Sequence, residues 1–278
     1  MPSLRHRFFG WALKRQGFPE RFEQMVDGPG LKRHYPRKHK GGQKEFEGFP
    51  FLWFDPPGER KKAVIVALHG GGYISEAQPP HLSAYAKMAK MTGMRVYAPY
   101  YPLAPEHGPE AILGWTRRFI DYVLEHNADP PLLLTGDSAG ANLALHMIRD
   151  GVKAERLVLW SPWVDMEMEN PELVLHNGKC ALLELGTIGK ISHNIADKAG
   201  LRAMSPTFWD SEDLPPTLVI SGDHDLFHPD IEAWVAKRRG QGADITLDTQ
   251  PDLFHDYVIF PTPEGKRAQM MTADFLSA

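Results

Sequence analysis

Several features that mark specialised classes of protein are scarce or absent in this sequence. It has one cysteine, Cys180, in 278 residues, which excludes an intramolecular disulfide and a cysteine-rich metal site and fits a reducing compartment. The sequence has no apolar run of about 20 residues that could span a membrane. Residues 1–21 mix basic and aromatic residues and lack the apolar core of a secretory signal. We therefore expect a cytoplasmic protein without an integral membrane segment, in which Cys180 is buried and inert.

Excess positive charge is also missing. The 31 basic residues are outnumbered by 35 acidic ones, and a net charge of -4 does not favour binding to nucleic acid. A local basic cluster could meet phosphate or an anionic surface, although a solvated loop is the simpler interpretation; it comprises Lys32, Arg33, Arg37, Lys38, Lys40 and Lys44. With 42% apolar and 24% charged residues, and no visible repeat, the chain can form a full globular core.

The most informative stretch that is present is GDSAG at residues 136–140. It follows an apolar run at 132–135 and opens a helical pattern at 141–148. A serine between a strand and a helix, with a glycine two residues to either side, is the pattern of a nucleophile elbow. The glycines permit a turn that larger residues would resist, and this turn exposes the hydroxyl of Ser138 above a helix N-terminus.

A second glycine-rich stretch, HGGG at residues 69–72, ends another apolar run. An acyl-transfer enzyme must stabilise a negative oxygen in its tetrahedral intermediate, and preorganised backbone N–H groups do this well. We assign that role to Gly71, Gly72 and Ala139. On their own the glycines could equally form a flexible turn after a strand, but Ser138 makes that interpretation the weaker one.

A serine hydroxyl is a poor nucleophile, so a base has to take its proton and an acid has to orient the base. The sequence has 13 histidines, and position along the chain must decide between them. In a doubly wound hydrolase sheet the acid and then the histidine follow the serine, on loops after later strands. The buried-strand pattern at 216–221 runs into an acidic loop at 222–228, and a strand candidate at 245–248 leads to His255.

Together these motifs resemble those of the hormone-sensitive-lipase-like carboxylesterases of the α/β-hydrolase fold, which carry HGGG and GDSAG. The resemblance covers roughly residues 69–257, and further matches are YPLAPEH at 101–107, SPWVD at 161–165 and Ser205-Pro206. Pro102 stands where the family usually has an arginine.

The resemblance implies a catalytic acid at Asp225, with Asp223 as the alternative, and a base at His255. Asp256 and Tyr257 replace the glycine and phenylalanine that usually follow the family's histidine.

The acid loop, DLFHPD at 225–230, also departs from the family's DPLRD but keeps the aspartate. By the same pattern, His224 and His228 belong to the acid loop. His69 braces the glycine loop, and Glu106 and His107 form a structural turn.

Strand-like and helix-like segments alternate along the chain, which predicts a parallel sheet with crossover helices. We expect an α/β-hydrolase fold with a mostly parallel central sheet, helices on both faces and a helical cap. The predicted strands are 63–68, 95–101, 131–135, 156–160, 216–221 and 245–249, preceded by an antiparallel pair at 43–47 and 50–54. The predicted helices are 80–92, 110–126, 139–150, 229–239 and 264–276.

We expect the domain organisation to be an N-terminal cap segment, residues 1–42, and a catalytic domain, residues 43–278, with a cap insertion at about 165–205. In the insertion, apolar residues recur every three or four positions and predict a cap helix that faces the core or the acyl pocket: Leu182, Leu185, Ile188, Ile191 and Ile195. The amphipathic N-terminal segment would also suit a membrane surface, but the resemblance favours a cap.

The predicted function is hydrolysis of small-molecule carboxylic esters of short to medium chain length through a covalent acyl-enzyme, without metal or organic cofactor. Activity should rise with pH through the pKa of the histidine, near 6.5 if unperturbed. An amidase, formamidase or lactonase would use the same triad, and a chain of this fold that had lost catalysis would be a ligand-binding protein. The resemblance also allows a homodimer.

Overall fold

The computed structural model of the protein describes residues 1–17, 40–210 and 213–278 and is built around one eight-stranded sheet. The strands are β1 (Gly41–Phe46), β2 (Phe49–Phe54), β3 (Val64–Leu68), β4 (Arg95–Pro99), β5 (Leu132–Asp137), β6 (Arg156–Trp160), β7 (Thr217–Gly222) and β8 (Ile245–Gln250). Their order is β1-β2-β4-β3-β5-β6-β7-β8. β2 pairs antiparallel with both β1 and β4, whereas all the other neighbours are parallel. The expected mostly parallel sheet with an antiparallel leading pair is thus confirmed.

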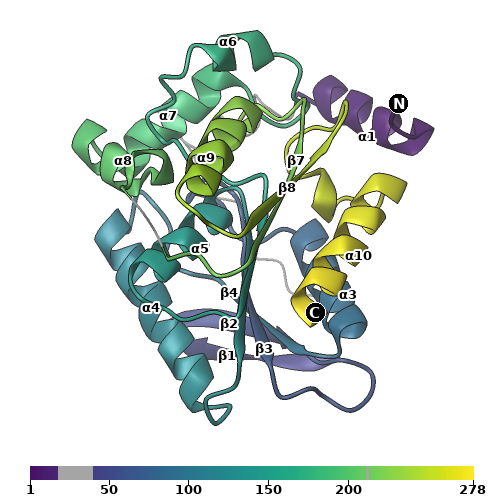
Figure 1. The fold of residues 1–278 in the computed structure, drawn as a ribbon, viewed down its shortest axis with the longest axis vertical. Helices are drawn as coiled ribbons and strands as arrows, with labels where there is room; N and C mark the ends of the chain where they lie inside the picture. The colour runs from purple at the N-terminus through teal and green to yellow at the C-terminus, as the bar shows by residue number, and fades with distance from the viewer. Residues whose placement is uncertain (18–39, 211–212) are drawn as a thin grey trace.

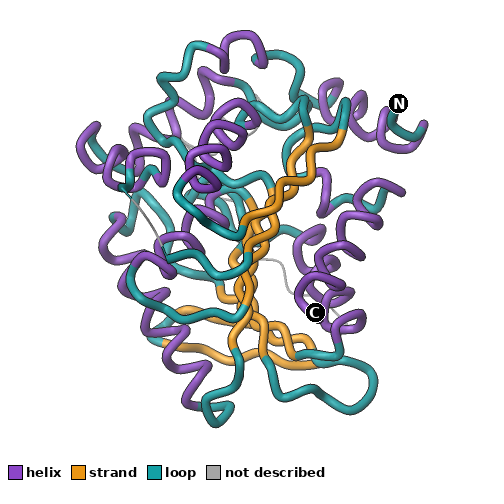
Figure 2. The backbone as a smooth tube through the Cα atoms, in the orientation of Figure 1, coloured by secondary structure: helices purple, strands orange, loops and turns teal. Residues whose placement is uncertain are grey.

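Helices cover both faces of this sheet, which is seen nearly edge-on in Figures 1 and 2. The helices are α1 (Leu4–Arg15), α3 (Pro79–Thr92), α4 (Pro109–Glu125), α5 (Ala139–Arg149), α6 (Glu172–His176), α7 (Leu185–Ile195), α8 (Lys198–Met204), α9 (His228–Gly240) and α10 (Pro263–Ser277), with short 3-10 turns at Pro206–Phe208 and Tyr257–Ile259. α3 and α10 pack together on one face, and α4, α5 and α9 lie on the other (Figure 1).

The sequence pattern explains these elements. All five residues of β3 are buried, as expected for a parallel strand that is covered on both faces and therefore reads as a continuous apolar run. In α4, Trp115 and Phe119 lie one helical turn apart, stack with ring centroids 5.3 Å apart and are buried against the sheet. The aromatic residues of this helix therefore belong to the core.

In the described residues of the insertion between β6 and β7 lie the helices α6 and α7, at the top of the molecule in Figure 1, and α8, at its left. The expected apolar stripe lies on α7, where Ile188, Ile191 and Ile195 are buried. The inclusion of Leu182 in that helix was wrong. The Glu184 carboxylate accepts the N–H of Thr187 at 2.9 Å and caps the helix, so that α7 begins only at Leu185.

Helix α1 packs beside α10 and against the loop that follows β8. The hydroxyl of Ser3 donates to Glu264 Oε2 on α10 at 2.8 Å, and the ring of His6 stacks on Phe254 with centroids 4.4 Å apart. Because Phe254 precedes His255, the N-terminal helix is joined directly to the loop that carries the expected base.

Part of the basic cluster and all of the described helices can be compared with the expectations from the sequence. Lys32, Arg33, Arg37 and Lys38 lie outside the described residues, whereas Lys40 and Lys44 are exposed. Within residues 1–17, 40–210 and 213–278, none of the helices combines the length and apolar character that crossing a membrane requires.

Candidate active site

The site lies at the carboxyl ends of the parallel strands, where open α/β sheets bind their ligands. The glycine loop follows β3, Ser138 follows β5, Asp225 follows β7 and His255 follows β8. Residues that are up to about 190 positions apart in sequence therefore meet at one edge because their strands run in the same direction.

Ser138 stands alone between β5 and α5, as the elbow pattern predicts. Its backbone has φ 52° and ψ -117°, a conformation that costs roughly 1–3 kcal/mol for a residue with a side chain. The turn is tight enough that a Cβ at Gly140 would lie 2.1 Å from the carbonyl oxygen of Leu68, which explains why glycine is needed there. Ser138 is 6% exposed and lies at the N-terminus of α5.

The structure brings Asp225, and not Asp223, to His255. The two carboxylate oxygens of Asp225 lie 2.9 and 3.0 Å from Nδ1 of His255, and Asp225 is completely buried. Asp223 instead accepts the N–H of Asp252 at 2.6 Å. The carboxylate of Asp225 is also held by the N–H of Phe227, at 3.0 Å, which fixes its orientation toward the imidazole.

The other ring nitrogen of His255 makes a contact that sequence reasoning missed. Nε2 lies 3.1 Å from Oδ2 of Asp256, the next residue in the chain. Among the hydrogen bonds of the described residues, none joins His255 to the hydroxyl of Ser138. The only available signal was the departure from the family's glycine at this position.

The glycine loop supplies backbone donors around Ser138. Gly71 and Gly72 have φ values of 117° and 62°, which side chains other than hydrogen rarely tolerate. No hydrogen bond between residues in the described part of the chain uses the N–H of Gly71, Gly72 or Ala139. Gly72 and Ala139 are buried and Gly71 is partly buried. Because buried N–H groups are nearly always paired, these unused donors around one serine indicate a place for a negatively charged or polar ligand atom.

His69 supports this loop, as expected. Its Nδ1 donates to the carbonyl of Gly70 at 2.7 Å, and its ring stacks on Tyr101 with centroids 4.3 Å apart. Burial lowers the pKa of His69 to about 4, so the ring is neutral and acts as a brace.

Asp137, in the GDSAG motif itself, is a second support that sequence reasoning did not identify. Its Oδ2 accepts the N–H of Gly70 at 2.8 Å and lies 3.0 Å from Nε2 of His81, while the hydroxyl of Tyr85 donates to Oδ1 at 3.4 Å. A polar residue next to the nucleophile in an otherwise apolar strand was the signal, since a buried carboxylate requires donors. Asp137 thus ties the glycine loop to the elbow.

Ser138, His255 and the glycine loop open into one cavity of about 260 Å³. Apolar residues from α1, from the insertion and from the loop before α10 line it: Leu13, Leu182, Leu183, Ile188, Ile259 and Phe260. Polar lining residues are Ser75, Glu76, Gln78, His81 and Asp256. A mostly apolar cavity with a few convergent polar groups is typical of a small-molecule site.

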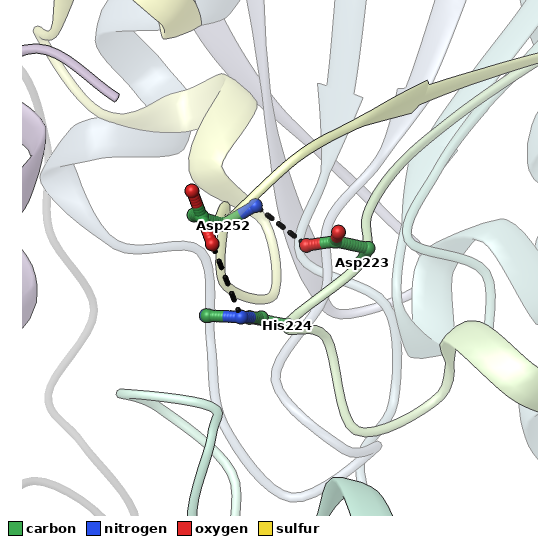
Figure 3. A group of neighbouring side chains, drawn as sticks. All are labelled: Asp223, His224 and Asp252. Carbon is green, nitrogen blue, oxygen red and sulfur yellow. Dashed lines mark hydrogen bonds and ion pairs between the residues drawn. The ribbon is translucent and has the colours of Figure 1, made fainter. Parts of the chain in front are cut away.

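A separate group of possible ligand atoms lies at Asp223, His224 and Asp252 (Figure 3). These atoms are within 4.8 Å of one another, and the residues are partly or fully exposed. The contact of Asp252 with Asp223 and the 3.4 Å approach of His224 Nε2 to Asp252 Oδ1 account for their arrangement without an ion. We assign no metal site to them.

Comparison with known proteins identifies the family of the chain. The model of a family described as having the alpha/beta hydrolase fold matches residues 65–259. An esterase of Acinetobacter venetianus is 27% identical over 226 residues, which are 77% of this chain and 75% of the relative. An acetyl-hydrolase of Streptomyces hygroscopicus is 26% identical over 230 residues, 79% of this chain and 77% of the relative.

A solved structure has the same fold. The crystal structure of an esterase from the bacterial hormone-sensitive lipase family superposes with a TM-score of 0.81 at 25% identity and covers 95% of this chain and 97% of that one. The fold, the order of the motifs and the family match together show that this chain belongs to the hormone-sensitive-lipase-like family of the α/β-hydrolase fold.

Proposed function

We propose that the protein is a serine carboxylesterase that hydrolyses short- to medium-chain carboxylic esters through a covalent acyl-enzyme. The observation that carries this proposal is that a strained serine, the histidine of a buried histidine–aspartate pair and two glycines with unused backbone N–H groups line one cavity, with a third unused N–H group on the residue after the serine. The names of the relatives from Acinetobacter venetianus and Streptomyces hygroscopicus, an esterase and an acetyl-hydrolase, support ester hydrolysis.

In the proposed mechanism the hydroxyl of Ser138 attacks the ester carbonyl as Nε2 of His255 takes its proton. Asp225 accepts the Nδ1–H of His255, which keeps Nε2 free of hydrogen in the neutral ring and stabilises the imidazolium that forms. His255 then gives the proton to the departing alcohol. Water, activated by the same nitrogen, releases the carboxylic acid from Ser138.

The negative oxygen of each tetrahedral intermediate would bind to the N–H groups of Gly71, Gly72 and Ala139. These donors need no rearrangement, because the loop is held by Asp137 and His69, and Ala139 is the first residue of α5. The positive end of the helix dipole adds to the stabilisation. Losing one such donor typically costs 100- to 1000-fold in rate.

The cavity supports a preference for small acyl groups. Its volume of about 260 Å³ lies below the range of roughly 300–1,000 Å³ typical of small-molecule sites. Leu182, Leu183 and Ile188 come from the insertion and Leu13 from α1. We therefore propose that α1 and the insertion together form the cap and define the acyl pocket.

The test is hydrolysis of p-nitrophenyl esters from acetate to palmitate by the wild type, by Ser138→Ala and by Ser83→Ala, a control at an exposed serine on α3. We expect turnover of the short esters by the wild type and by the control, and a loss of about 10⁴-fold or more in folded Ser138→Ala. Residual activity in Ser138→Ala close to that of the wild type would overturn the mechanism. A folded wild type that cleaves only amides or lactones would overturn the substrate class, and one inert toward all of them would indicate a ligand-binding protein.

A further inference from the structure

Asp256 is placed against the proposed catalytic base by its own backbone. It has a left-handed conformation, φ 52° and ψ 27°, directly after His255, and its N–H donates to the hydroxyl of Ser161 at 3.1 Å. This turn brings Oδ2 to 3.1 Å from Nε2 of His255, while Asp225 lies 2.9 Å from Nδ1 on the opposite edge of the ring. The imidazole therefore sits between two carboxylates.

The side chain of Asp256 is only 8% exposed, and its Oδ1 has no hydrogen-bond partner in the described part of the chain. A buried carboxylate normally receives two or more hydrogen bonds, so that this one depends on His255 to an unusual degree. The backbone does not require an aspartate, since glycine adopts a left-handed conformation more readily. The side chain of Asp256 thus contacts His255, and it does so at Nε2, the nitrogen that the proposed reaction needs.

The neighbouring carboxylates favour a proton in this contact. The titratable side chains near it are Asp137, His81 and Tyr85 beside the elbow, Asp225 across the ring, Glu76 in the cavity lining and the buried thiol of Cys180. Burial, together with the charges of Asp137 and Asp225, raises the pKa of Asp256 to about 7 even though His255 opposes this. Burial alone would lower the pKa of His255, but the charges of Asp225 and Asp256 and the hydrogen bonds to both raise it well above its usual value.

A proton held between Nε2 and Oδ2 leaves no lone pair on Nε2 to accept the proton of Ser138. We propose, on the basis of the esterase function proposed above, that Asp256 competes with Ser138 for Nε2 of His255 and restricts catalysis to the alkaline side of the pH range in which an ordinary histidine base works. Asp256 is a positioning residue in this scheme, because it acts through His255. Catalysis begins when the proton leaves and the ring and the carboxylate separate.

The experiment is the pH dependence of kcat/KM for p-nitrophenyl acetate between pH 5 and 9.5 in the wild type, Asp256→Asn and Asp256→Gly. Asp252→Asn is the matched control, because Asp252 is in the same loop and also has a positive φ, 59°, but is exposed and contacts His224. An opposite charge in contact shifts a pKa by about 1–3 units. We therefore expect the acid limb of both Asp256 variants to move down by about 1 pH unit or more, and that of the control to stay at the wild-type position.

The rate of Ser138 phosphonylation by a fluorophosphonate, measured over the same pH range, separates this inference from the proposed function. In that reaction the serine oxygen bonds to phosphorus, fluoride leaves and the proton passes to His255, so that no ester substrate is needed. The same shift in phosphonylation supports the role of Asp256 even if the esters are not substrates. If the acid limbs of the pH profiles stay at the wild-type position in both folded Asp256 variants, the role of Asp256 is overturned, whatever the maximal rates of the variants. The esterase proposal would still stand. A wild type that is not phosphonylated overturns both.

Discussion

Replacing Asp137 tests how the glycine loop is held next to the nucleophile. The structure gives the carboxylate two close donors on one oxygen, the N–H of Gly70 at 2.8 Å and Nε2 of His81 at 3.0 Å. The N–H of Gln78 donates to Nδ1 of His81 at 3.0 Å, so that Nδ1 is the acceptor and Nε2 carries the hydrogen. All of these groups are buried or partly buried, so that a lost partner is not readily replaced by water.

The magnitude follows from counting those donors. Asp137→Ala leaves two buried N–H groups unpaired, at about 1–3 kcal/mol each, and we expect the free energy of unfolding to fall by about 4 kcal/mol. In Asp137→Asn the amide oxygen can occupy the position of Oδ2 and accept from Gly70 and His81, while the amide nitrogen faces the hydroxyl of Tyr85. The free energy of unfolding then falls by only about 1 kcal/mol, because hydrogen bonds to a neutral amide oxygen are weaker than those to a charged carboxylate.

The assay is urea unfolding at pH 7 followed by tryptophan fluorescence, combined with kcat/KM for p-nitrophenyl acetate. The sequence has seven tryptophans to report unfolding. In Asp137→Ala the released loop misplaces the N–H groups of Gly71 and Gly72, and we expect a loss of about 100-fold in kcat, against less than about 10-fold in Asp137→Asn. If the unfolding free energies of the two variants agreed within about 0.5 kcal/mol, the view of Asp137 as the anchor of the loop would be refuted.

Three further predictions concern the site. Asp225→Asn should lower kcat by about 10⁴-fold while Asp223→Asn stays within about 3-fold of the wild type in steady-state kinetics; similar losses would contradict the assignment of the acid. Gly71→Ala should lower kcat by about 100-fold or more, because φ is 117° and the new Cβ would lie 2.6 Å from the carbonyl oxygen of Ser75; wild-type kinetics would exclude Gly71 as a donor. Leu183→Trp should shorten the longest p-nitrophenyl ester that is hydrolysed, and an unchanged chain-length profile would place the acyl group elsewhere.

Much of the fold follows from local patterns. The apolar runs at 63–68, 131–135 and 216–221 correspond to β3, β5 and β7 to within two residues, because a strand covered on both faces has to be apolar throughout. Prolines also mark helix starts, since Pro79, Pro109 and Pro263 each occupy the first residue of a helix. The start of α7 was missed because the apolar spacing extends back to Leu182, which precedes Glu184, the residue that caps the helix.

The sequence by itself determined the strand–turn–helix around Ser138, the glycine loop and the order in which acid and histidine follow, because each depends on residues close together in the chain. Tertiary structure alone decided between Asp225 and Asp223, since two carboxylates two residues apart differ only in which partner the sheet brings to them. It also decided the partners of Asp137 and the contact of Asp256 with His255. Local sequence marked Asp137 and Asp256 as unusual but could not give their hydrogen-bond partners or the protonation that burial imposes, because these depend on three-dimensional distance and on the exclusion of water.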